Sequence, residues 1–268
     1  MNKGNTPGNM LNQKPIYYNI GPNTTAFTTT REGGCSIGQY ASFNANHYCG
    51  DDPQHVAANR TMLCKLLDIE PDRLIVPHQT HGTNLRIIDQ HFMTESHDMR
   101  TQMLEGIDAT TTDMSGVALC VSTADCVPIL IYDPIHHAAA AIHAGWRGTV
   151  ARIAELTLQA MSSNYGTRGH DCSAVIGPSI SVDSFEVGDE VYETFDKAGF
   201  DMQAIAVRHA KWHIDLWKCN RMQLEVQGVN PNMITTANIC TYRQSDRFFS
   251  ARKLGINSGR MLTGIIMK

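Results

Sequence analysis

Four short segments between residues 108 and 144 constrain the fold more than any other part of the chain. They read DATTT (108–112), GVALCVST (116–123), PILIYD (128–133) and HHAAAAIHA (136–144). Runs of this length with turn residues between them are typical of strands. The last three are apolar almost throughout, which is typical of strands that are covered on both faces. The sequence therefore predicts a buried sheet at the centre of the molecule.

Helices and further strands are predicted on either side of this run. Apolar residues at helical spacing predict a helix over 51–69, capped by Asp51 or Asp52, and another over 148–166 that ends at Gly166. Shorter helices are expected over 189–199 and 215–228, and strands over 16–20, 25–30, 84–89, 172–180, 233–240 and 259–268, while 73–82 is expected to be a strand that runs into a loop with two histidines. The polar, methionine-rich residues 91–105 are expected to form an excursion. This mixture predicts a single mixed α/β domain over 14–268, preceded by a loose leader over 1–13.

Composition and charge narrow the class of function. The chain is 42% hydrophobic and 18% charged, with a formal net charge of -4. Neither nucleic acid nor a membrane surface is an expected partner, since both favour clustered basic residues. The first twenty residues lack the apolar segment of a secretory signal, and no run reaches the roughly 18 apolar residues of a membrane span. We therefore expect a cytoplasmic protein whose eight cysteines stay reduced.

Three potential metal ligands lie where predicted strands meet loops: His81 in HQTHG, Cys126 in TADC and His143 in HAGWRG. Two imidazoles and one thiolate leave a fourth position open, as catalytic zinc sites do. The same set would also suit a single copper ion. In a third interpretation, Cys126 is a thiolate nucleophile that His143 activates. The separations along the chain match no short zinc signature, so the residues alone leave these alternatives open.

Polar residues near the three candidates suit an anionic or nucleoside substrate. Arg147 follows Trp146 at the start of a predicted helix, where an arginine and free N–H groups favour phosphate. Asp125 is a candidate for proton transfer, or else a group that fixes His143 or the turn. Arg260 in SGR is a further candidate for an anion. The residues to which we assign substrate contact are Arg31, Asn44, Arg60, Gln79 and Arg252.

Several motifs in a fixed order resemble those of the YfiH-type laccase-domain family, also called multicopper polyphenol oxidoreductase or purine nucleoside phosphorylase family proteins. These motifs are HQTHG, STADCVPILIYD, AAIHAGWRGT, IGPSI…FEVGDEV and CTYR…RFFSARK…SGR, with TTREGGCSIGQYASFN and GDDPQHVAANR upstream. The resemblance covers roughly residues 24–268. It implies one domain of layered sheets and helices, related in fold to cysteine hydrolases. It also implies that His81, Cys126 and His143 hold a metal.

The resemblance further implies an activity. The family is associated with phosphorolysis of adenosine, inosine, guanosine and methylthioadenosine, and with adenosine deamination. Copper-dependent polyphenol oxidation and hydrolytic editing of peptidoglycan precursors are the alternatives. We therefore expect a zinc enzyme, monomeric or weakly dimeric, whose partners are purine nucleosides and phosphate. The chain departs from the family in two places: Ser184–Phe185 replaces a frequent Cys-Tyr pair, and His78 is an extra imidazole that could compete as a ligand.

Overall fold

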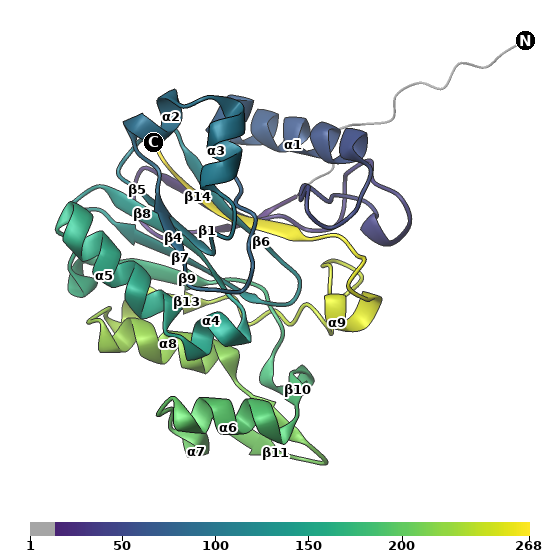
Figure 1. Ribbon diagram of the computed structural model, residues 1–268, viewed down its shortest axis with the longest axis vertical. Coiled ribbons are helices and arrows are strands. Elements are labelled where there is room, and N and C mark those ends of the chain that lie inside the picture. The colour runs from purple at the N-terminus through teal and green to yellow at the C-terminus, as the bar shows by residue number, and fades with distance from the viewer. Residues whose placement is uncertain (1–13) are drawn as a thin grey trace, which may run out of the picture.

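Two sheets lie face to face in the computed structural model, which describes residues 14–268 (Figure 1). The predicted leader over 1–13 lies outside the described residues. The larger sheet has the order β13 (Ile234–Thr236), β9 (Ser173–Ile176), β7 (Val127–Asp133), β8 (Ala138–Ala144), β5 (Ala109–Thr112) and β4 (Leu85–Ile87). The second has the order β1 (Ile16–Tyr18), β2 (Thr24–Thr28), β14 (Met261–Met267), β6 (Ala118–Thr123) and β3 (Leu74–Ile75).

Alternation along β7 shows why its sequence is apolar throughout. Ile129 and Ile131 pack among the residues of the helical layer, whereas Leu130 and Tyr132 pack against the five-stranded sheet. Side chains of successive strand residues point to opposite faces, so a strand covered on both sides must be apolar at every position. The predicted buried sheet is thereby confirmed.

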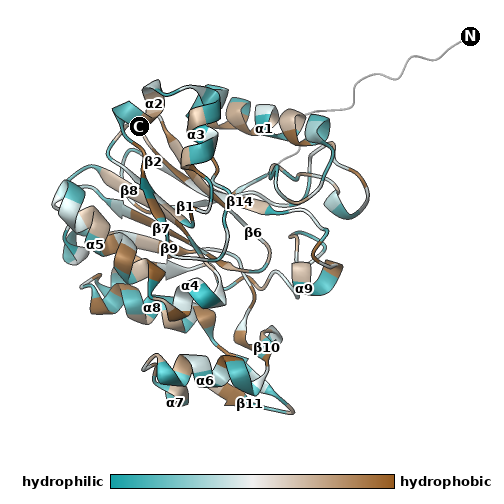
Figure 2. Ribbon diagram, in the orientation of Figure 1, coloured by the Kyte–Doolittle hydropathy of each residue, from teal (hydrophilic) through white to brown (hydrophobic). Residues whose placement is uncertain are grey.

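Helices cover the outer faces of both sheets, which gives four layers in all. On the six-stranded sheet lie α5 (Ile153–Tyr165) and α8 (Leu216–Val226). On the five-stranded sheet lies α1 (Pro53–Leu67), whose Leu63 and Leu67 pack on that sheet. Brown, apolar residues alternate with teal, polar ones along α5 and α8 in Figure 2, and the buried apolar residues of both helices pack in one core with those of the six-stranded sheet. The mixed α/β domain with layered sheets and flanking helices is as expected.

A small sheet of β10 (Glu186–Val187), β12 (Trp212–Ile214) and β11 (Ala206–Arg208) lies beyond α8, at the bottom of Figure 1. It is accompanied by α6 (Asp189–Lys197) and α7 (Met202–Ile205). The last helix, α9 (Ala251–Leu254), precedes β14. Among the described residues, no helix is long and apolar enough to cross a membrane.

The helix predicted over 148–166 is wrong in one respect, because the chain forms two helices there. The first, α4 (Trp146–Val150), is separated from α5 by Arg152, which adopts a left-handed φ of 63°. The break is stabilised from outside: Gln223 donates to the carbonyl oxygen of Thr149 at 2.8 Å, and the Arg152 guanidinium lies 3.8 Å from the centre of the Phe200 ring. Apolar periodicity carries no information about these distant contacts.

Two other predictions also need correction. The excursion predicted over 91–105 contains α2 (Gln90–Thr94) and α3 (His97–Met103), whose first turns are capped by the side chains of Asp89 and Ser96. The ends of such short helices are set by capping side chains. The helices have too few turns to produce a periodic pattern in the sequence. The strand predicted over 233–240 is confined to β13, since the chain leaves the sheet after Thr236.

Candidate metal centre

The structure brings His81, Cys126 and His143 together, with one potential ligand atom of each lying within 4.8 Å of the others. His81 lies in the loop after β3, Cys126 immediately precedes β7, and His143 is the penultimate residue of β8. Because β7 and β8 pair in antiparallel register, with Val127 opposite Ala144, the start of one strand meets the end of the other. The three side chains therefore converge at one edge of the six-stranded sheet.

Gly145 makes this convergence possible. A Cβ atom added to it would lie 3.0 Å from Cδ2 of His81 and 3.2 Å from Sγ of Cys126. Its φ of −65° is open to any residue, so the glycine is needed for space and not for backbone conformation.

A buried carboxylate orients both histidines. Oδ1 of Asp108 accepts a hydrogen bond from Nδ1 of His143 at 2.7 Å and from the backbone N–H of His81 at 2.9 Å. Oδ2 accepts from the N–H of Gly82 at 2.7 Å. His81 itself has a left-handed φ of 65°, and these bonds hold its loop in that conformation. A carboxylate behind a ligand histidine is a common feature of metal sites.

The electrostatics favour a deprotonated sulfur. Burial raises the pKa of Cys126, but the charge of His143 and hydrogen bonds from both histidines outweigh it and lower the pKa to about 6. Burial lowers the pKa of His143, but the Cys126 thiolate and the Asp108 carboxylate raise it to about 9. Burial also opposes the charge on Asp108, yet its bonds to His143 and to backbone N–H groups hold its pKa below the ordinary value.

These observations fit a metal ion. The donor set of two imidazoles and one thiolate is one that zinc and copper accept. Asp108 occupies Nδ1 of His143, which leaves Nε2 as the nitrogen available to a metal. His78 does not join the set, because its Nδ1 lies 2.7 Å from Glu105 and its ring stacks on Tyr48.

The three candidate ligands line one side of a cavity of about 180 Å³, which we call the metal pocket. Its other lining residues come from the loop after β2, the loop after β3, the end of β6 and the segment before β14. They are Asn46, Tyr48, Cys49, His78, Gln79, Ser122, Ala124, Ile256 and Arg260.

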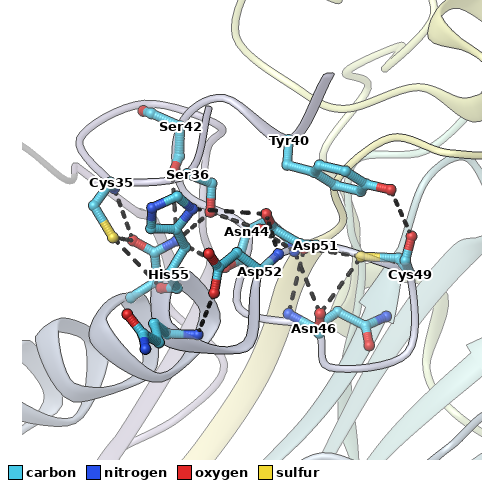
Figure 3. Close-up of polar contacts among 12 residues, drawn as sticks. Cys35, Ser36, Tyr40, Ser42, Asn44, Asn46, Cys49, Asp51, Asp52 and His55 are labelled. Atoms are coloured by element: carbon cyan, nitrogen blue, oxygen red, sulfur yellow. Dashed lines mark hydrogen bonds and ion pairs between the residues drawn. The ribbon is translucent and has the colours of Figure 1, made fainter. Parts of the chain in front are cut away.

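A network of polar side chains holds the loop that presents Asn46, Tyr48 and Cys49 to the pocket (Figure 3). Asn44 donates to Asp51 at 2.9 Å, and Ser36 donates to the same carboxylate oxygen at 2.6 Å. Asn46 is tied to the sheet by a 2.9 Å bond to the hydroxyl of Ser122. The polar residues of this loop therefore stabilise its conformation, which their spacing in the sequence does not indicate.

Two of the predicted catalytic residues lie away from the pocket lining. Arg147 is exposed, and its guanidinium stacks 4.3 Å from the centre of the Trp146 ring. The carboxylate of Asp125 accepts from the Thr241 hydroxyl at 2.6 Å and from the backbone N–H of Arg252 at 2.9 Å. Asp125 thus ties the loop at Thr241 to the first turn of α9, and Asp108 makes the bond to His143 that one interpretation gave to Asp125.

The predicted substrate-binding residues are dispersed. Gln79 lines the metal pocket and exchanges two hydrogen bonds with the backbone of Ser122. Arg31 instead binds backbone carbonyl oxygens of residues 41 and 245. Arg252 donates to the backbone of residue 186 at 2.9 Å. Arg60 lines a separate hollow, and Asn44 accepts from the backbone N–H of residue 260 at 3.1 Å, which fixes the approach to β14.

Sequence reasoning missed Asp108 and gave little weight to Arg260. Asp108 is the first residue of the predicted strand DATTT, and an aspartate entering an otherwise buried strand is the signal that could have found it. Arg260 lines the metal pocket, while its guanidinium donates to backbone carbonyl oxygens of residues 256, 258 and 259.

Comparisons with known proteins identify the family of the chain. Residues 25–268 match the family model described as multi-copper polyphenol oxidoreductase laccase. A purine nucleoside phosphorylase of Bacteroides thetaiotaomicron is 52% identical over 248 residues, covering 91% of this chain and 92% of the relative. The adenosine deaminase RL5 of an unknown prokaryotic organism is 42% identical, covering 91% and 94%. The crystal structure of YlmD from Geobacillus stearothermophilus is 30% identical, with a TM-score of 0.86 and coverage of 92% and 93%.

Proposed function

This chain belongs to the multi-copper polyphenol oxidoreductase laccase family, and we propose that it is a zinc-dependent enzyme that phosphorolyses purine nucleosides and deaminates adenosine. The observation that carries the proposal is the convergence of His81, Cys126 and His143 on one edge of a pocket, with Asp108 bonded to both histidines. The substrate class rests on the two relatives named purine nucleoside phosphorylase and adenosine deaminase.

His81, Cys126 and His143 would hold the zinc ion, which supplies a Lewis acid and lowers the pKa of a coordinating water toward about 7. Asp108 keeps the proton of His143 on Nδ1 and so presents Nε2 to the pocket. The same carboxylate fixes the loop that carries His81.

The remaining lining suits a nucleoside. Tyr48 and His78, whose rings stack with centres 4.2 Å apart, both line the pocket and offer aromatic contacts to a purine. The Gln79 side chain is fixed by its bonds to Ser122, and Arg260 adds positive charge. Phosphorolysis breaks the bond between base and ribose and joins the ribose carbon to a phosphate oxygen. Deamination instead exchanges the adenine amine for a water oxygen and releases ammonia.

A product assay on metal-quantified protein tests the proposal. Adenosine and inosine are incubated with and without phosphate, and the free base, ribose 1-phosphate and inosine are measured by chromatography. We expect free base only with phosphate, loss of both activities on chelation, and recovery with zinc. Cys126→Ser should lack metal and activity, whereas Cys35→Ser, at an exposed thiol outside the pocket, should keep both. Full activity after complete removal of the metal would overturn the proposal.

A second candidate function is hydrolysis by a thiol nucleophile. It is favoured by one observation: the Cys126 pKa is lowered to about 6 beside a His143 whose pKa is raised to about 9. A thiolate paired with an imidazolium is the resting state of cysteine hydrolases. In this case the metal-free protein would be the active form, so the chelation arm of the same assay separates the two functions.

A further inference from the structure

A second hollow, of about 360 Å³, adjoins the metal pocket at Tyr48, whose ring lines both. Its cationic side consists of Arg60 on α1, Arg100 and His97 on α3, and His47 in the loop before α1. Its apolar side includes Ile75, Phe92 and Leu104. We call it the cationic hollow. The helix α3, which the sequence did not predict, supplies half of its basic residues.

Neither arginine of the cationic hollow forms an ion pair among the described residues. Arg60 makes one long hydrogen bond, from Nη2 to the carbonyl oxygen of Leu74 at 3.4 Å. Arg100 donates from Nη1 to the carbonyl oxygen of Asp72 at 3.2 Å, while its buried Nε has no partner. Across residues 14–268, neither arginine lies within ion-pair distance of a carboxylate. Partly buried guanidinium groups are ordinarily paired.

The pKa values of two side chains in the hollow are lowered, mainly by burial. Burial lowers the pKa of Arg60. Burial, and then the charges of Arg60 and His97, lower the pKa of His47. One acidic residue, Asp72, also lines the hollow, and it forms an ion pair with neither arginine. The hollow therefore carries a positive charge that its own residues do not neutralise.

We propose that the cationic hollow binds a phosphate-type oxyanion between Arg60 and Arg100. Guanidinium groups present paired N–H donors that match the oxygens of a phosphate, and Arg60 and Arg100 each use a single terminal nitrogen to bond a backbone oxygen. The apolar side, with Ile75 and Phe92, leaves room for an organic body attached to the phosphate. The anion is thus either inorganic phosphate or the phosphate of a nucleoside monophosphate. The site does not depend on which reaction the metal pocket catalyses.

Calorimetric titration of the metal-loaded protein at pH 7 tests the site and its source of phosphate. One arm uses inorganic phosphate and the other adenosine 5′-monophosphate, and the arm that binds more tightly identifies the source. Arg100→Gln should weaken that binding by roughly ten- to a hundredfold, because it removes a hydrogen bond to a charged group. Arg168→Gln, which removes an exposed arginine paired with Asp171, should leave it unchanged.

The location is checked independently by NMR of the histidine side chains. Saturation with the tighter ligand should shift the signals of His47 and His97 and raise the pKa of His47, since a nearby anion favours the imidazolium. Arg260→Gln, in the metal pocket, should not alter this shift. Arg60→Gln should abolish the ligand-induced shift of the histidine signals. If that variant does not fold, the same measurement on Arg100→Gln tests the location of the site. Failure of both ligands to bind, or wild-type affinity in Arg100→Gln, would refute the proposal.

Discussion

Asp108 and His143 are joined by a 2.7 Å hydrogen bond between Oδ1 and Nδ1, and both side chains are buried. The same carboxylate accepts backbone N–H groups of the His81 loop. One residue therefore sets the side-chain orientation of one candidate ligand and the backbone position of another. Metal affinity should depend on Asp108, although it touches no metal itself.

Asp108→Asn is expected to lower zinc affinity by roughly ten- to a hundredfold, the usual cost of losing a carboxylate behind a ligand histidine. The amide keeps one acceptor oxygen, but its NH₂ group replaces the other oxygen and cannot accept a hydrogen bond from the N–H donors that face it. Competition with a chromophoric chelator measures the change. Asp133→Asn is the matched control, because Asp133 is a buried carboxylate that binds a different histidine, His136, at 2.8 Å. Equal affinity losses in both variants would show that the effect is general destabilisation.

The reactivity of Cys126 in metal-free protein should follow an apparent pKa of about 6. Because this value lies below that of an ordinary thiol, about 8.5, the thiolate persists down to about pH 6. The imidazolium of His143 persists up to about pH 9. The ion pair consequently stabilises the metal-free fold between these limits. Its contribution is lost as pH falls through 6, when the thiolate is protonated, and as pH rises through 9, when His143 is deprotonated.

Alkylation rates measured by mass spectrometry from pH 5 to 10 test this expectation. Cys35 serves as an internal reference, because burial and the nearby Asp51 and Asp52 raise its pKa above the ordinary value. Cys126 should react fully at pH 7, where Cys35 is slow, and zinc should protect Cys126 alone. An inflection for Cys126 at or above that for Cys35 would contradict the ion pair.

The sequence was sufficient to predict the buried central strands and the three candidate ligands, for two separate reasons. Apolar runs bounded by turn residues predict the strands, and such runs are a local property of the sequence. The candidate ligands are donor residues where predicted strands meet loops, and the family resemblance then favoured a metal, since their spacing alone favoured no single chemistry. Convergence of His81 with Cys126 depends on the pairing of strands distant in sequence, which no local pattern encodes.

Asp108 and the break at Arg152 show what local patterns cannot supply. Asp108 acts through bonds to residues 26 to 35 positions away. The break in the 148–166 helix depends on Gln223, which lies 74 positions from Thr149. The phosphate role predicted for Arg147 stays a prediction: the side chain stacks on the adjacent Trp146 and lies outside the lining of the metal pocket.

Gln223→Ala should destabilise the protein by about 0.5–1.5 kcal/mol, the net contribution of one hydrogen bond, because the Thr149 carbonyl oxygen also accepts from the backbone N–H of Arg152 at 3.1 Å and so keeps a partner. Its Nε2 is the donor to the Thr149 carbonyl oxygen at the end of α4, and both residues are buried. Chemical denaturation of the metal-free protein measures the free energy of unfolding. Gln159→Ala, at an exposed position of α5, should change it by less than about 0.5 kcal/mol. Similar values for the two variants would mean that the bond at the break contributes nothing.

Gly145→Ala should lower the affinity for zinc without lowering the stability of the metal-free protein. The added methyl would lie 3.0 Å from Cδ2 of His81 and 3.2 Å from Sγ of Cys126, so one of these side chains must move. The glycine's φ of −65° suits alanine, and such a change at a compatible position stabilises a fold by about 0.4–1 kcal/mol through the unfolded chain.

We therefore expect metal-free Gly145→Ala to unfold at the wild-type temperature or slightly above, while its zinc affinity falls by about tenfold, as for other disturbed ligand geometries. Arg147→Lys is the control, because Arg147 is exposed and lies outside the pocket lining, and its zinc affinity should match that of the wild type. If Gly145→Ala also bound zinc normally, His81 would be free to shift without loss. The close approach of residue 145 to the ligands would then have no part in shaping the site.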